Sequence, residues 1–234
     1  MSGIAKTISS SVGAKSLMAL TGLGLLGFVV AHMLGNLQIF AGPDTLNAYA
    51  KQLQDLGPLL WAARLGLLAL FLLHVATAFR LVQANKAARP VPYARKVDQC
   101  TTYAARTMWV SGIVVALFVA YHLAHFTLRV TGEGFGGDAY RITEGALAGG
   151  HDVYAMVVDG FSVWWVSALY VVAQVVLGLH ISHGAQSAFQ TLGVRHPRLA
   201  FLTSGFGPTA AAVIVLGNVS IPLAVLLGVV GKGA

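Results

Sequence analysis

Cysteine and charge are both scarce in this chain. Cys100 is the single cysteine among 234 residues, so neither a disulfide framework nor a thiolate metal site can be built. Charged residues make up only 10% of the chain, against 56% hydrophobic residues and a mean hydropathy of +0.73. A soluble domain usually has roughly a quarter of its residues charged. The shortage of charge therefore excludes an ordinary soluble domain and indicates an integral membrane protein.

The uncharged stretches are long enough to cross a bilayer five times. A helix needs about 20 apolar residues to span roughly 30 Å of hydrocarbon. We predict an all-α bundle of five transmembrane helices, which forms a single membrane domain over residues 1–234. A short surface helix is expected within 41–58, and 131–160 is expected to be a long loop. The predicted spans are about 16–40, 59–82, 107–130, 161–190 and 207–230.

Acidic residues are few, and their distribution predicts the topology. The chain has 8 acidic and 15 basic residues, and all the acids except Asp98 lie on one side of the predicted membrane. The positive-inside rule then places the N-terminus inside and the C-terminus outside. This arrangement explains the net charge of +7 without nucleic acid as a partner. The basic residues on the inner side are Lys6, Lys15, Arg80, Lys86, Arg89, Arg95, Lys96, Arg106, Arg195 and Arg198.

Each of the first four spans carries a histidine deep within it. A polar group at that depth is costly unless it is coordinated or hydrogen-bonded. Spans one and three ascend, so His32 and His122, each about fifteen residues along at 1.5 Å per residue, lie near the outer leaflet. Spans two and four descend, so His74 and His180 lie near the inner leaflet. Two neutral imidazoles facing each other fit the axial positions of a haem iron, so the two depths predict two haems.

Two further histidines leave the choice of ligand open. His125 follows His122 by three residues and His183 follows His180 by three, and residues at this spacing share a helix face. Either member of each pair could ligate, or the pair could bind a metal together. A supporting or interfacial role is the expectation for His125 and His183. The chain contains no C-x-x-C-H sequence, so any haem is held without covalent attachment.

The ordered set of motifs resembles a known family. The motifs are S-S-V-G-A-K-S-L-M-A-L-T-G and A-H-M-L-G-N in span one, L-L-H-V-A-T-A-F-R in span two, Y-H-L-A-H-F in span three, and G-L-H-I-S-H-G-A-Q-S-A-F-Q-T-L-G-V in span four. They are similar to the single-chain, di-haem cytochrome b subunit (b558 type) of succinate dehydrogenases and fumarate reductases. The resemblance covers most of the chain except 131–160. It implies haem ligation by His32 with His122 and by His74 with His180.

The resemblance also implies partners and a cellular place. The chain would lie in the inner (cytoplasmic) membrane, beside a flavoprotein subunit and an iron–sulfur subunit, in a complex that could form dimers or trimers. It would pass electrons between the iron–sulfur subunit and a quinone, with menaquinone as the preferred candidate, in respiration or the tricarboxylic acid cycle. No dicarboxylate activity is expected from this chain alone. The basic stretches 83–106 and 195–198 would dock the iron–sulfur subunit.

Quinone and propionate contacts are assigned more loosely. Related anchors use an acidic residue after the first span, and the matching stretch here, A-K-Q-L-Q-D-L-G, offers Gln54 and Asp55 instead of a glutamate. Asp44, His151 and Tyr154 are further quinone candidates, and a quinone site on the inner side, near the iron–sulfur docking face, is equally open. Haem propionates seek basic or hydroxyl partners. The candidates are Lys15, Ser16, Arg106 and His183 for the inner haem, and Arg64 and Arg129 for the outer haem, although each charged residue could equally be an interfacial charge.

Three alternatives remain open at this point. The chain could be the di-haem subunit of another membrane oxidoreductase, such as a hydrogenase or formate dehydrogenase. It could hold a non-haem metal in the two closely spaced histidine pairs, although the topology puts those pairs on opposite sides of the membrane. It could also be an anchor without a cofactor, which leaves four costly histidines unexplained.

Overall fold

A computed structural model describes residues 10–88, 91, 102–132, 135–136, 138–194 and 196–231. Every regular element within these residues is a helix. In chain order they are α2 (Ser11–Asn36), η1 (Leu37–Ala41), α3 (Pro43–Asp55), α4 (Pro58–Ala87), α5 (Tyr103–His122), η2 (Leu123–Thr127), α6 (Val153–Ser162), α7 (Trp164–Thr191), η3 (Pro197–Leu199), α8 (Ala200–Ser204) and α9 (Phe206–Leu226).

Five helices are long and apolar enough to cross a membrane, which confirms the predicted all-helical class and the number of spans. Local sequence explains where they begin. Ser10 and Thr102 cap α2 and α5 by accepting hydrogen bonds from the backbone N–H groups of Gly13 and Ala105, and proline occupies the first turn of α4. Such caps satisfy amide groups that have no partner within the helix.

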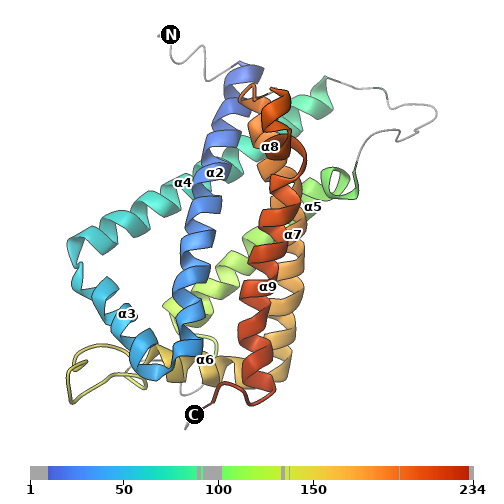
Figure 1. The fold of residues 1–234 in the computed structure, drawn as a ribbon. Coiled ribbons are helices and arrows are strands. Elements are labelled where there is room, and N and C mark those ends of the chain that lie inside the picture. The colour runs from blue at the N-terminus through green and yellow to red at the C-terminus, as the bar shows by residue number, and fades with distance from the viewer. Residues whose placement is uncertain are drawn as a thin grey trace.

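The spans form a layered bundle (Figure 1). Helices α2, α7 and α9 stand side by side, while α4 and α5 are inclined to them. Helix α4 packs on α2, α2 on α7, and α7 on α5, and the rings of Phe79 and Trp109 approach to 6.4 Å between α4 and α5. Around the bundle the order is therefore α4, α2, α7, α5, and α9 packs on the outside of α7. In this order α2 lies diagonally from α5, and α4 diagonally from α7.

The two ends of the bundle differ in structure. One end, here called the α6 end, carries α3, α6 and the described residues between 128 and 152 (Figure 1). There Asn47 donates to Asp152 at 2.9 Å and accepts from the backbone N–H of Tyr154 at 3.0 Å, which ties α3 to α6. The other end, here called the basic end, holds the starts of α2 and α5 and the ends of α4 and α7.

Two stretches differ from the sequence prediction. Residues 153–162, expected as the end of a loop and the start of span four, form the separate helix α6, and the chain is extended at Val163 before α7 begins. Ten residues are too few to cross the membrane, so α6 lies across the α6 end (Figure 1) and buries Tyr154, Val158 and Phe161. Residues 197–204, expected as part of a loop, form η3 and α8. The surface helix expected within 41–58 is α3.

Several of the charged residues that predict the topology are not described by the structure. The predicted division between inside and outside therefore stays a prediction. The charged residues concerned are Lys6, Arg89, Arg95, Lys96, Asp98, Glu133, Arg195 and Lys232; Cys100 also lies outside the described residues.

Candidate cofactor sites

The four span histidines lie in two pairs across the bundle. The ring centroids of His32 and His122 are 5.7 Å apart with an interplanar angle of 83°. Those of His74 and His180 are 6.5 Å apart at 71°. The first pair joins α2 to α5 and the second joins α4 to α7, so each pair spans one diagonal of the four-helix arrangement. These are the two pairs expected from depth along the spans.

The separations within both pairs suit a metal between the rings. Two metal–nitrogen bonds of about 2 Å each, plus the distance from each nitrogen to its ring centre, place two axial imidazoles roughly 6 Å apart. The observed 5.7 Å and 6.5 Å bracket this value. The residues present therefore fit bis-histidine ligation of a haem, while ligation itself stays a prediction.

The distance between the two pairs can be measured along α2 and α5. A β-carbon added at Gly22 would lie 3.3 Å from Cε1 of His74, and one at Gly112 would lie 3.5 Å from Cε1 of His180. Each glycine precedes the histidine of its own helix by ten residues (22 to 32, 112 to 122). At about 1.5 Å per residue the pairs are roughly 15 Å apart along the helices. That is about half the thickness of the hydrocarbon layer.

Hydroxyl groups from neighbouring helices contact the His74–His180 pair. The Oγ1 atom of Thr21 on α2 lies 3.0 Å from Nδ1 of His74, and the Oγ atom of Ser111 on α5 lies 3.2 Å from Nδ1 of His180. Both hydroxyl residues are buried, at 3% and 4% exposure. The hydroxyl contacts are made at Nδ1, so Nε2 is the nitrogen of each ring that does not take part in them.

An aromatic cluster surrounds the His32–His122 pair instead. The Tyr170 hydroxyl lies 3.3 Å from Nδ1 of His122 and 3.0 Å from Nδ1 of His125. The His122 ring also meets Phe118 at 5.9 Å and Phe126 at 5.8 Å. His32 stacks on Phe28 of its own helix, with ring centroids 5.4 Å apart. The Tyr170 hydroxyl is therefore a hydrogen-bond partner of both His122 and His125.

The structure separates His122 from His125. Helix α5 ends at His122, and the next five residues form the π-helix η2. A π-helix has i→i+5 hydrogen bonds and turns less per residue than an α-helix, so the two rings have different further neighbours, although both reach the Tyr170 hydroxyl. His125 is 3% exposed, stacks on Phe135 at 4.8 Å, and its ring would contact a β-carbon at Gly160 of α6 at 3.0 Å. It packs against the α6 end, whereas His122 meets His32.

The propionate candidates divide between the two ends. Lys15 and Ser16 lie in the second turn of α2 and Arg106 lies in the first turn of α5, all at the basic end, and His183 lies one turn beyond His180 on α7. Arg64 is on α4 near the α6 end, with its guanidinium carbon 5.1 Å from the centroid of the Trp61 ring. Arg129 has a left-handed backbone with φ 56° just after η2. The two sets therefore lie at opposite ends of the bundle, and both their membrane sides and their binding roles stay predictions.

The quinone candidates are not gathered at one place. Asp55 is on α3 and forms an ion pair with Lys51, one turn earlier; Gln54 is its partly exposed neighbour, and Asp44 is in the first turn of α3. His151 forms an isolated bridge with Arg141. Burial lowers the pKa of His151, and the charges of Arg129 and Arg141 lower it further.

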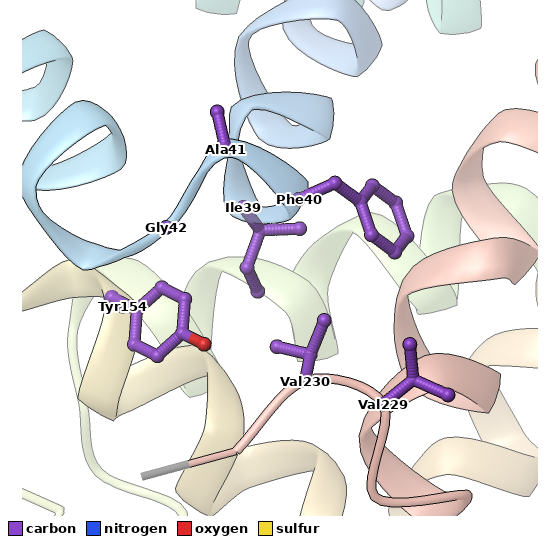
Figure 2. Close-up of a pocket in the computed structure, with 7 residues that line it drawn as sticks. All are labelled: Ile39, Phe40, Ala41, Gly42, Tyr154, Val229 and Val230. Atoms are coloured by element: carbon purple, nitrogen blue, oxygen red, sulfur yellow. The ribbon is translucent and has the colours of Figure 1, made fainter. Parts of the chain in front are cut away.

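Tyr154 lines a pocket at the α6 end (Figure 2). The pocket has a volume of about 320 Å³, a size typical of small-ligand sites. The Tyr154 hydroxyl donates to the carbonyl of Gly231 at 3.3 Å and is the one side-chain polar group on the wall. The other lining residues are Ile39, Phe40, Ala41, Gly42, Val229 and Val230.

Three contacts were missed by the sequence argument. Thr21, Ser111 and Tyr170 come from helices other than those of the histidines they touch, so no spacing along one helix points to them. A weaker signal was present, because a hydroxyl residue precedes glycine in both T-G at 21–22 and S-G at 111–112.

A non-haem metal site usually needs three or more ligating side chains close together. Within the described residues, no group of three or more His, Cys, Asp or Glu could hold a metal ion. No protein-family model matches the chain, and neither a curated protein nor a solved structure matches it.

Proposed function

We propose that this chain is the membrane anchor and electron-transfer subunit of a succinate:quinone oxidoreductase or fumarate reductase, and that it holds two b haems. The observation that carries the proposal is the pair of diagonal histidine contacts, His32 with His122 and His74 with His180, at two levels of the bundle. A packing role would not require four imidazoles to meet in pairs inside apolar helices. The motif resemblance supplies the identity of the complex.

The chain's own residues would hold and insulate the cofactors. The four imidazoles would provide the axial ligands, and Gly22 and Gly112 leave room beside the His74 and His180 rings. When bound, haem supplies one-electron chemistry at an iron whose potential the protein tunes. The helices would keep water and ions away from both levels, and with a separation of roughly 15 Å along α2 and α5 one site would lie toward each membrane surface.

The two ends of the bundle would serve different partners. Exposed basic side chains at the basic end would attract the iron–sulfur subunit; those described are Lys15, Arg80, Lys86, Arg106 and Arg198. With these residues inside, the N-terminus is cytoplasmic and the α6 end faces outward. Among the quinone candidates we favour Tyr154, because it lines an apolar pocket with one hydroxyl group. The membrane would be the cell's inner membrane and the quinone menaquinone.

A reduced-minus-oxidised spectrum of the purified chain in lipid tests the proposal. We expect a b-type α-band and two haems per chain, with no succinate or fumarate activity from the chain alone. Purification from native membranes should also recover a flavoprotein and an iron–sulfur subunit. Recovery of hydrogenase or formate dehydrogenase subunits would transfer the function to that alternative. A chain that carries no haem after expression with ample haem supply would overturn the proposal.

A further inference from the structure

Helices α2 and α5 carry the same unit at the same spacing. In α2, Thr21 and Gly22 precede His32 by eleven and ten residues; in α5, Ser111 and Gly112 precede His122 by eleven and ten. Both hydroxyls reach Nδ1 of a histidine on another helix, and both glycines face that same ring. Each unit therefore contributes a histidine to one pair and a hydroxyl with a glycine to the other pair.

The hydroxyl contacts have a direction. Thr21 Oγ1 lies 2.8 Å from the carbonyl oxygen of Leu17, and Ser111 Oγ lies 3.1 Å from that of Met108. A hydroxyl has one proton and two lone pairs, and a backbone carbonyl can only accept. A hydroxyl that donates to its carbonyl must accept from the imidazole, so Nδ1 of His74 and of His180 each carry the proton. A neutral ring protonated at Nδ1 has its lone pair on Nε2.

We propose that Thr21 and Ser111 are positioning residues that hold His74 and His180 as Nδ1–H tautomers with Nε2 free to bind iron, through a unit repeated in α2 and α5. This inference rests on the proposed function, since it concerns ligands of the same site. An accepted hydrogen bond at Nδ1 also makes the ligating nitrogen more basic. Greater ligand basicity favours the oxidised iron and lowers the reduction potential of the haem at this pair.

Matched variants test the role of the hydroxyl in the haem-loaded chain. Thr21→Val and Ser111→Ala should each raise the midpoint potential of the His74–His180 haem, by about tenfold in the reduction equilibrium or about 59 mV for one electron. The His32–His122 haem should keep its potential. Thr21→Ser keeps the hydroxyl and should restore the wild-type value.

Thr77→Val is the structural control. Thr77 is 5% exposed and donates to the carbonyl of Leu73 at 2.7 Å, so the variant removes a similar buried hydroxyl from α4 without touching an imidazole contact. It should leave both potentials unchanged. Loss of the His74–His180 haem in Thr21→Val, with retention in Thr21→Ser and Thr77→Val, would also support the inference. Equal potentials in Thr21→Val and wild type would overturn it.

A measurement without haem separates this inference from the proposed function. Nitrogen-15 spectra of histidine-labelled, haem-free chain in lipid should show His74 and His180 as Nδ1–H tautomers, and Thr21→Val should release His74 alone. If the tautomers depend on the hydroxyls but wild type binds no haem, the proposed function fails and the positioning role stands. If haem binds while Thr21→Val changes neither tautomer nor potential, the positioning role fails and the function stands.

Discussion

The His74–His180 pair and the His32–His122 pair have similar ring separations but different surroundings. Each ring of the first pair has its own buried hydroxyl, contributed by a different helix. In the second pair, His122 shares the Tyr170 hydroxyl with His125, and His32 stacks on Phe28. Similar ring separations are therefore supported by small hydroxyl side chains at one level of the bundle and by an aromatic cluster at the other.

This difference follows from what packs around each level. At the His74–His180 level, Gly22 and Gly112 let α2 and α5 approach the rings closely, and the small side chains of Thr21 and Ser111 contact the imidazoles. At the His32–His122 level, α6 and the described residues between 128 and 152 lie at the end of the bundle, and Phe118, Phe126 and Tyr170 contact the His122 ring. We therefore expect the two sites to respond separately to mutation.

Truncation of one of the paired histidines should have the largest effect on the difference between the two sites. If the chain holds two haems as proposed, His74→Ala should reduce the haem content from two per chain to one, because the His74–His180 site would lose one of its two ligands. The His32–His122 haem should remain. The haem-to-protein ratio and the split of the α-band measure this, with His196→Ala, which truncates an exposed histidine outside both pairs, as a control that keeps both haems. Loss of both haems in His74→Ala would show that the two sites are not independent.

The next effect distinguishes two neighbouring histidines. His122→Ala should lose the His32–His122 haem, whereas His125→Ala should retain both haems. His125 instead packs at 3% exposure against Phe126 and Phe135, so its truncation should cost about 2–4 kcal/mol of stability, as for other buried rings. Haem content and thermal unfolding measure the two outcomes. Loss of haem from His125→Ala alone would reverse the ligand assignment.

Tyr170→Phe should have a smaller effect, confined to the His32–His122 site. The ring would keep its contacts with Phe118 and Phe161, but Nδ1 of both His122 and His125 would lose a partner, at a cost of about 1–3 kcal/mol. We expect both haems to be retained and only the His32–His122 haem to shift in potential. A shift at the other haem would contradict the separation of the two surroundings.

The smallest effect is a pH dependence confined to the α6 end. Burial and two neighbouring arginines lower the pKa of His151 in the folded chain, while in the unfolded chain it is near 6.5. The unfolded chain therefore binds more protons below that value, so local stability should be full above about pH 6.5 and fall as the pH drops below it.

Hydrogen exchange of two amides can measure this loss. The backbone N–H groups of Ile142 and Asp152 donate to the carbonyls of Gly150 and Tyr140 beside His151, so their protection should fall between pH 8 and pH 5.5. Amides of α2 near Thr21 should not change, and His151→Gln should abolish the pH dependence. An equal loss of protection at both ends of the bundle would contradict this assignment to His151.

Much of the fold could be predicted because it depends on local composition. Helix number follows from uncharged stretches that each match the membrane thickness, and the depth of each histidine follows from its position within a stretch. Helix α6 was missed because its ten apolar residues run almost directly into α7, and the break at Val163 is a backbone turn without a proline or glycine at that position.

By itself, the sequence determined that there are five apolar helices and that their histidines fall at two levels. Only the tertiary structure decided that α2 lies diagonally from α5 and α4 from α7, that η2 turns His125 toward α6, and that Thr21, Ser111 and Tyr170 meet histidines of other helices. The physical reason is the range of the interactions. Hydropathy and helix rise act along one segment, whereas a hydroxyl–imidazole contact joins residues that are 48 to 69 positions apart in the chain.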